Sequence, residues 1–158
     1  MNIDCNEMIP DRLWVGGYLR PEDAGSLAKK FISTVLNLQT EEDLAAHGIQ
    51  MKKLLKAYES AEIELRRVPI ADFDNESLVT KLPLCVSELE KALKPEWARV
   101  YVHCTAGLNR SPTVAAAYLI RSANMSAKEA YDYVTARRHC SPSREILEKY
   151  EELLKIQL

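Results

Sequence analysis

The chain has 158 residues, of which 47% are hydrophobic and 28% charged, and its formal net charge is −2. A chain of this length can bury a core as one domain, and no apolar run is long enough to span a bilayer. The near-neutral charge argues against nucleic acid as the main partner, and we expect no membrane partner either.

The N-terminal residues carry acids and lack the apolar stretch of a signal peptide. The four cysteines show no metal-type spacing, so we expect no metal and no cofactor; they are Cys5, Cys85, Cys104 and Cys140.

The first half of the chain alternates between strand and helix patterns. A short strand over 13–15 ends at the pair Gly16-Gly17. After it we predict, in chain order, a helix over 21–30, a strand over 31–38, a helix over 51–60 and a strand over 61–68. Pro69 ends the last of these strands.

The second half continues the alternation. Apolar residues between Leu78 and Leu93 fall on one helical face, and Pro83 is expected to divide that segment into a turn and a longer helix. A buried strand over 99–102 precedes a helix that starts near Ser111. A capping box at Ser126 starts a helix through residue 137, and the pair 141–142 opens the last helix.

Strands that alternate with helices favour an α/β fold with a mainly parallel sheet covered by helices on both faces. Without repeats or linkers, we interpret residues 1–158 as a single domain. Ligands of such sheets bind beyond the carboxyl ends of the strands. Asp72 and Asp74 follow the strand at 61–68 and should emerge at that edge. From these residues alone, the segment is either a solvated acidic turn or a source of a proton donor.

The most informative segment is the loop that follows the strand at 99–102, with the sequence His-Cys-Thr-Ala-Gly-Leu-Asn-Arg-Ser-Pro over 103–112. Main-chain N–H groups that curl around Cys104, together with a helix N-terminus, stabilise a thiolate and hold phosphate oxygens. Arg110 offers a planar fork that matches two phosphate oxygens. Ser111 is the expected N-cap of the helix, with Pro112 in the first turn. The order strand, loop and helix predicts a phosphate-binding nucleophile.

This loop resembles the signature HC-x-x-G-x-x-R-[ST] of the cysteine-dependent phosphatases, in the dual-specificity branch. The resemblance implies hydrolysis of phosphomonoesters through a phosphocysteine intermediate, without a metal or cofactor. It implies that Cys104 is the nucleophile and Arg110 the phosphate ligand, and a catalytic thiolate implies a reducing, cytoplasmic compartment. The implied general acid is Asp72, with Asp74 as the runner-up.

The same resemblance assigns supporting roles to the rest of the loop. Ser111 donates a hydrogen bond to the departing thiolate when water attacks the intermediate. His103 orders the loop through hydrogen bonds and is not expected to transfer protons. The expected substrate-binding positions are Thr105, Ala106, Gly107, Leu108 and Asn109 in the loop, together with Phe73.

Over nearly the whole chain, from about Ile9 to Arg144, the sequence is also similar to the plant glucan phosphatases. That family stacks sugar rings on aromatic side chains just before a Gly-Ile pair, where this chain has Ala46 and His47. Only Phe73 stands at a matching aromatic position. The similarity therefore supports the scaffold more than the substrate.

Three functions remain open at this stage. A phosphatase of phosphorylated proteins is favoured, because the uncharged loop lining argues against ligands with several phosphates and most of the sugar-stacking aromatics are absent. A phosphatase of phosphorylated carbohydrate (starch or glycogen type) or of another small phosphoester is the alternative. A non-catalytic phosphate-binding module is disfavoured, because such a module has no need of Cys104.

Overall fold

The computed structural model describes residues 3–157, which form five strands and seven α-helices with one short 3₁₀ helix. The strands are β1 (Cys5–Ile9), β2 (Leu13–Gly16), β3 (Thr34–Asn37), β4 (Glu64–Arg67) and β5 (Val100–His103). The helices are η1 (Pro21–Asp23), α1 (Ala24–Lys29), α2 (Glu41–Ala46), α3 (Met51–Ser60), α4 (Asn75–Leu93), α5 (Arg110–Ser122), α6 (Ala127–Arg137) and α7 (Arg144–Ile156).

The strands form one sheet in the order β1-β2-β5-β3-β4. Only β1 runs antiparallel, as an edge strand against β2, and the other four strands are parallel. β5 lies in the middle, with its last residue, His103, in register with Gly16 on one side and Asn37 on the other. The loop after β5 therefore emerges at the centre of the carboxyl edge.

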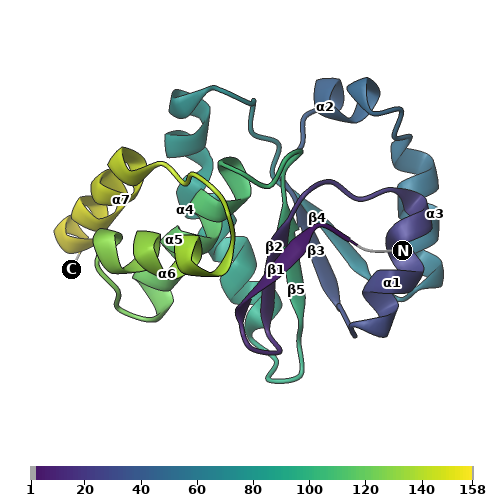
Figure 1. The fold of residues 1–158 in the computed structure, drawn as a ribbon, viewed down its shortest axis with the longest axis horizontal. Coiled ribbons are helices and arrows are strands. Elements are labelled where there is room, and N and C mark those ends of the chain that lie inside the picture. Colours follow the sequence, from purple (N-terminus) through teal and green to yellow (C-terminus); the bar gives the residue numbers. More distant parts are fainter. Residues whose placement is uncertain (1–2, 158) are drawn as a thin grey trace.

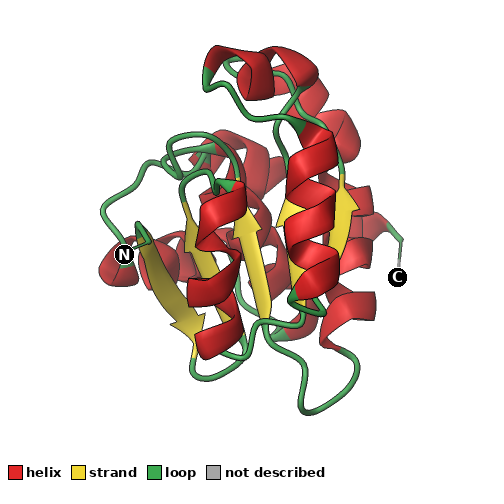
Figure 2. Cartoon of the chain, turned by 90° about the vertical axis from the view of Figure 1, so that its right-hand side faces the viewer, coloured by secondary structure: helices red, strands yellow, loops and turns green. Residues whose placement is uncertain are grey.

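Helices cover both faces of the sheet, as Figures 1 and 2 show: α4 to α7 lie on one side, and α1 and α3 on the other. Alternate strand residues enter two apolar cores, because successive side chains point to opposite faces. In β5, Val102 packs with the α4–α7 side and Tyr101 with the α1–α3 side. The α/β prediction, with its mainly parallel sheet covered on both faces, is confirmed.

Two predicted strands are shorter than expected. Instead of 31–38, β3 covers Thr34–Asn37, since Phe31 has a φ of 61° in the turn that leaves α1. Instead of 61–68, β4 covers Glu64–Arg67, since Glu62 has a φ of 59° after α3. In both cases a residue in left-handed conformation ends a helix inside the predicted strand. Strand β1 and helix α2 were not predicted.

The predicted division at Pro83 is wrong, because α4 runs unbroken from Asn75 to Leu93. Proline removes one main-chain hydrogen bond from the helix interior. Pro83 is exposed, and so is Val79, the residue four positions before it, so water can reach the carbonyl that loses its partner. The opposite face of α4 packs into the core through Leu82 and Val86, which holds the helix together.

The starts of two helices also differ from prediction. Asn109, not Ser111, is the N-cap of α5, and Ser111 lies inside the first turn. Ser143, not the pair 141–142, caps α7 by accepting a hydrogen bond from the main chain of Ile146. The capping box at Ser126 and the helix that follows it, α6, are as predicted.

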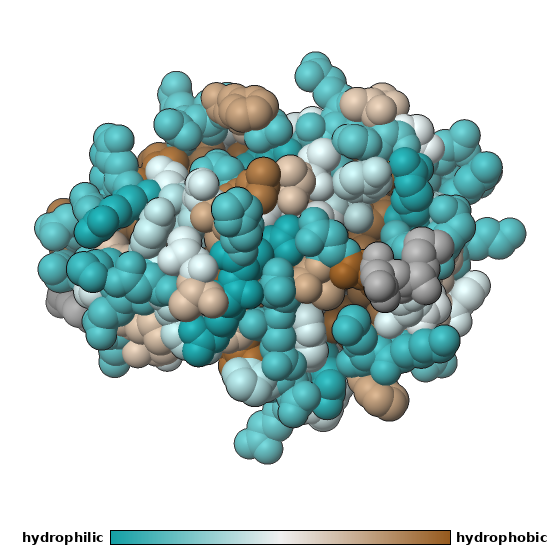
Figure 3. Space-filling model, in the orientation of Figure 1, coloured by the Kyte–Doolittle hydropathy of each residue, from teal (hydrophilic) through white to brown (hydrophobic). Residues whose placement is uncertain are grey.

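The surface is predominantly polar on the face drawn in Figure 3, where hydrophilic residues cover most of the area and apolar residues form small scattered groups. Within residues 3–157, none of the helices combines the length and the apolar character needed to cross a bilayer.

Candidate active site

The loop between β5 and α5 stands where parallel sheets bind ligands. Cys104 follows the last residue of β5 directly, and α5 begins at Arg110, so the helix N-terminus adjoins the loop. Two further main-chain hydrogen bonds anchor the loop to its neighbours: Tyr18 donates to Thr105 over 2.9 Å, and Ser141 donates to Leu108 over 2.7 Å. The loop is thus fixed from both sides.

The sulfur of Cys104 is buried among hydrogen-bond donors. The main-chain N–H of Gly107 lies 3.3 Å from Sγ, and the hydroxyl of Ser111 lies 3.2 Å from it. With the α5 N-terminus directly behind, these groups can donate to a sulfur that carries negative charge. Ser111 therefore sits beside the sulfur rather than at the helix cap.

Gly107 fits a position that no other residue can occupy without strain. Its φ is +70°, and a Cβ there would stand 2.5 Å from Nη2 of Arg138 and 2.6 Å from the carbonyl carbon of Gly16. Left-handed backbone and close packing both favour glycine. The tight turn at Gly107 is what aims its N–H at the sulfur.

Arg138, which the sequence analysis did not single out, holds this turn from behind. Its Nε donates to the carbonyl of Gly107 over 2.8 Å, and its Nη2 donates to that of Ala106 over 3.4 Å. Asp4 accepts from both terminal nitrogens of the guanidinium, at 3.0 and 3.1 Å. Arg138 is 5% exposed, so a buried guanidinium links the loop to the exposed carboxylate of Asp4, in the segment before β1.

Arg110 is 2% exposed and bonded on two of its edges. Nη1 donates to Oδ2 of Asp43 over 2.7 Å and to the carbonyl of Ile70 over 2.8 Å. Both hydrogens of Nη1 are therefore used. Nε and Nη2 form the third edge, which suits two oxygens of a phosphate and which the carboxylate of Asp72 approaches to 3.4 Å from Nε.

The two candidate acids have different environments. Oδ1 of Asp72 lies 3.4 Å from Nε of Arg110, and its side chain is 38% exposed. Asp74 is the N-cap of α4 and accepts a hydrogen bond from the main chain of Ser77 over 3.0 Å. Asp72 thus stands at the Nε–Nη2 edge of Arg110, whereas Asp74 stabilises a helix start. Phe73, between them, is 97% exposed with a φ of 58°.

Asp43 is the second residue of this site that sequence reasoning missed. It belongs to a capping box of α2, in which Thr40 and Asp43 bond each other's main-chain nitrogens. Burial raises the pKa of Asp43, but the hydrogen bond from Arg110 and those from Thr40 outweigh it, so the pKa is lowered overall. Asp43 therefore carries its negative charge against Arg110 at neutral pH.

His103 is fully buried under the loop. Its Nδ1 lies 2.8 Å from the carbonyl of Cys104, which can only accept, so Nδ1 carries the proton. Burial, with the charges of Arg110 and Arg67 adding to it, lowers the pKa of His103 to about 4. The ring is neutral at pH 7 and orders the main chain beside the sulfur.

Nε2 of His103 has no hydrogen-bond partner within the protein. Three neighbouring residues at the strand ends also carry a buried polar atom without a partner: Asn37, Gln39 and Arg67. Asn37 is in register with both His103 and Arg67, so the three side chains share one face of the sheet. Buried polar groups of this kind typically bind ordered water.

The predicted substrate-binding residues line the outer rim of the loop. Ala106 and Leu108 are exposed, Thr105 and Asn109 are partly so, and all four side chains are uncharged. Gln39 donates from Nε2 to Oγ1 of Thr105 over 3.1 Å. The rim also carries Tyr18, whose ring packs against that of His47 with 4.3 Å between centroids.

The other three cysteines are poor candidates for a nucleophile. Burial raises the pKa of the thiols of Cys5 and Cys140, and that of Cys85 to about 12. All four cysteines are free thiols. Within the part of the chain that the structure describes, no cluster of three or more His, Cys, Asp or Glu side chains could hold a metal.

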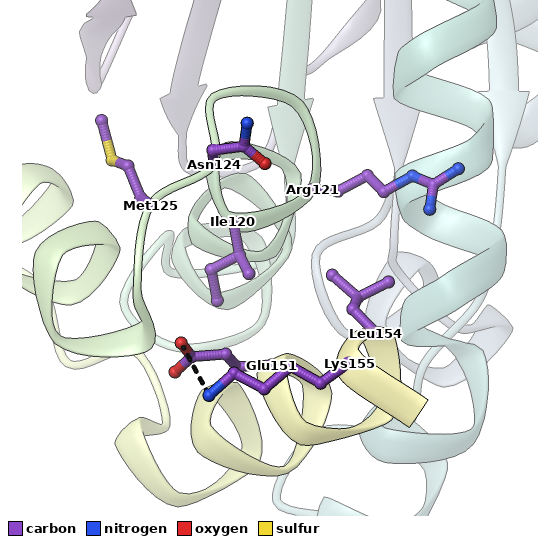
Figure 4. A pocket seen from close by; sticks show the side chains of 7 residues that line it. All are labelled: Ile120, Arg121, Asn124, Met125, Glu151, Leu154 and Lys155. Carbon is purple, nitrogen blue, oxygen red and sulfur yellow. Dashed lines mark ion pairs between the residues drawn. The ribbon is translucent and has the colours of Figure 1, made fainter. Parts of the chain in front are cut away.

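A separate surface pocket lies at the far end of α5, about 15 Å along the helix from Arg110. Figure 4 shows it between Ile120 on α5 and Leu154 on α7, with an ion pair between Glu151 and Lys155 on its rim. None of the residues lining it belongs to the loop at 103–111, so the reacting groups lie elsewhere.

Comparison with known proteins agrees with this geometry. Residues 13–152 match the family described as "Dual specificity phosphatase, catalytic domain". Over 146 residues the chain is 36% identical to "Phosphoglucan phosphatase DSP4, amyloplastic" of Castanea sativa, and the aligned region covers 90% of this chain and 38% of that protein. It is 32% identical over 132 residues to "Dual specificity protein phosphatase Mpk3" of Drosophila melanogaster, covering 84% and 29% respectively.

The chain thus spans well under half the length of these two relatives. Among solved structures, one described as "Crystal Structure of PTPMT1 in complex with PI(5)P" superimposes with a TM-score of 0.79. The two chains are 23% identical, and the match covers 98% of this chain and 99% of that one. The fold is therefore shared over nearly all of the described residues.

Proposed function

The chain belongs to the dual specificity phosphatase catalytic-domain family, and we propose that it hydrolyses phosphomonoesters through a phosphocysteine intermediate. One observation carries the proposal: the sulfur of Cys104 lies within 3.3 Å of both the Gly107 N–H and the Ser111 hydroxyl, at the N-terminus of α5. A nucleophile held at an anion-binding helix start suits attack on a phosphate.

The reaction proceeds in two displacements. Cys104 attacks phosphorus in line, while Asp72 gives its proton to the leaving ester oxygen. Asp72, now a carboxylate, takes a proton from the water that attacks the phosphocysteine, and the sulfur leaves as a thiolate that Ser111 stabilises. Arg110 and the loop N–H groups hold the equatorial oxygens in both steps. The protein supplies every group, so no metal or cofactor enters.

The favoured substrate is a phosphorylated protein. The rim residues Thr105, Ala106, Leu108 and Asn109 are uncharged, and carboxylates of Glu41 and Glu42 stand near Asp72 around one hollow. A site entrance with an uncharged rim and acidic side chains beside it disfavours ligands that carry several phosphates. A reducing, cytoplasmic compartment is part of the proposal, because it preserves the thiolate.

A phosphorylated carbohydrate is the second candidate. Two observations favour it: a relative named as a phosphoglucan phosphatase is 36% identical over 90% of the chain, and the exposed Phe73 stands beside Asp72. Sugar rings pack on flat apolar faces.

Phosphate release from a phosphotyrosyl peptide and from phosphorylated amylopectin, measured in parallel, tests the proposal and separates the candidates. Cys104→Ser serves as the blank and should lose turnover while it still binds inorganic phosphate. Faster release from the peptide supports a protein phosphatase, and faster release from amylopectin supports the glucan alternative. Turnover by Cys104→Ser near the wild-type rate would refute the mechanism.

A further inference from the structure

The guanidinium of Arg110 is oriented by groups outside its own loop. Its Nη1 donates to Asp43 on α2 over 2.7 Å and to the carbonyl of Ile70 over 2.8 Å. A planar guanidinium with one nitrogen fixed in this way has only one orientation left. Its Nε and Nη2 then form the edge that can meet a phosphate.

Asp43 is built to hold this orientation. The same oxygen, Oδ2, accepts from Nη1 of Arg110 and from the main-chain nitrogen of Thr40, the latter over 3.0 Å. In turn, the main-chain nitrogen of Asp43 donates to the hydroxyl of Thr40 over 3.2 Å. The side chain is 17% exposed, so little solvent competes with these bonds. The carboxylate is thus locked at the start of α2.

We infer that Asp43 is a positioning residue for phosphate binding, which fixes Nη1 of Arg110 so that the Nε–Nη2 edge faces the loop. The inference rests on the proposed function and extends it to a residue on a different element of the fold. Asp43 would touch neither the phosphate nor the sulfur and would act through Arg110 alone.

The opposite effect is also physically reasonable, which makes the inference testable. A carboxylate beside Arg110 cancels part of the positive charge that attracts phosphate. If Asp43 only neutralised charge, its removal would strengthen the binding of anions. If it positions Arg110, its removal weakens that binding, although the net positive charge of the site rises.

Tungstate binding measured by calorimetry separates positioning from charge neutralisation, because binding of this oxyanion is measured without any catalytic turnover. Asp43→Ala removes both the charge and the acceptor, whereas Asp43→Asn removes the charge and keeps an oxygen that can accept. We expect the dissociation constant of tungstate to rise about tenfold or more in Asp43→Ala and by less than about threefold in Asp43→Asn. Should Asp43→Ala not fold, Asp43→Ser replaces it, because its side chain is too short to reach Arg110.

Two control variants isolate the contact with Arg110. Thr40→Ala removes a hydroxyl but keeps the main-chain N–H of residue 40 and Arg110 as donors to Oδ2 of Asp43, and Glu129→Gln removes a charge from the matching capping box at the start of α6; both should bind tungstate as the wild type does. Equal or tighter binding by Asp43→Ala would overturn the inference, and so would an equal loss in Thr40→Ala. The kcat/KM values for an aryl and an alkyl phosphate should fall together in Asp43→Ala, since Arg110 serves both. If the wild type has no phosphatase activity, the proposed function fails while the tungstate series still tests Asp43.

Discussion

The carboxylate of Asp72 lies 3.4 Å from Nε of Arg110, at the edge of the guanidinium that faces the expected phosphate position. A general acid must reach the ester oxygen of a phosphate held by that same guanidinium. The neighbouring Asp74 instead caps α4 through the main chain of Ser77. This division of labour between two acids, two residues apart, leads to opposite expectations for their removal.

Asp72→Asn should lower kcat/KM for an alkyl phosphate by about a hundredfold, and by much less for an aryl phosphate with a good leaving group. A poor leaving group needs the proton, whereas a good one departs without it. Steady-state assays on the two substrates measure this ratio. An equal loss on both substrates would contradict the role of Asp72 as the acid.

Asp74→Ala should leave kcat/KM within a few fold and lower the free energy of unfolding by about 1 kcal/mol, the usual contribution of an N-cap. Urea denaturation gives the second value. A leaving-group-dependent loss of activity in this variant, with Asp72→Asn unaffected, would exchange the two assignments.

Ser111→Ala should slow the second step of the reaction about ten- to hundredfold, because the hydroxyl 3.2 Å from the sulfur stabilises charge that develops on the departing thiolate. The phosphocysteine then accumulates, and rapid-quench kinetics should show a burst of the leaving alcohol followed by slow turnover. Ser122→Ala, at the exposed end of the same helix, is the control. If Ser111→Ala slowed only the burst phase, Ser111 would act in the first step instead.

Gly107→Ala should destabilise the fold by about 2 kcal/mol or more and abolish activity. The added Cβ would meet main-chain atoms of Gly16 at 2.6 and 2.7 Å, and main chain has little freedom to move. Gly48→Ala is a matched control, because Gly48 also has a positive φ, of +64°, but nothing within 4 Å of the added atom. It should cost only the strain of about 1 kcal/mol. Equal losses in thermal denaturation would show that packing against Gly16 is unimportant.

These residues also show how far the sequence alone leads. The loop from Cys104 to Ser111 is contiguous, so its nucleophile, its arginine and its place between a strand and a helix follow from local pattern. Asp43 and Arg138 reach the same site from 67 and 31 positions away. No spacing rule links such distant residues, since only the folded sheet brings them together. The predicted break at Pro83 is wrong for a related reason: the packing of one face of α4 into the core outweighs the local effect of proline.

The neutral state of His103 makes stability depend on pH. Its pKa is about 4 in the fold against 6.5 in the unfolded chain, so only the unfolded state gains a proton between these values. The histidine contribution is therefore constant above about pH 6.5 and falls as the pH drops to 4. The loss amounts to about 3 kcal/mol, at 1.36 kcal/mol for each unit of pKa difference.

Urea denaturation of the wild type and of His103→Asn at pH 7 and pH 4 isolates this term. The asparagine cannot ionise but can still donate to the carbonyl of Cys104, so its loss of stability over the same range should be smaller by about 3 kcal/mol. If the variant does not fold, the ring nitrogens of the wild type can be followed by NMR and should stay neutral down to about pH 4. Protonation of that ring near pH 6.5 would mean that its burial under the loop does not hold in solution.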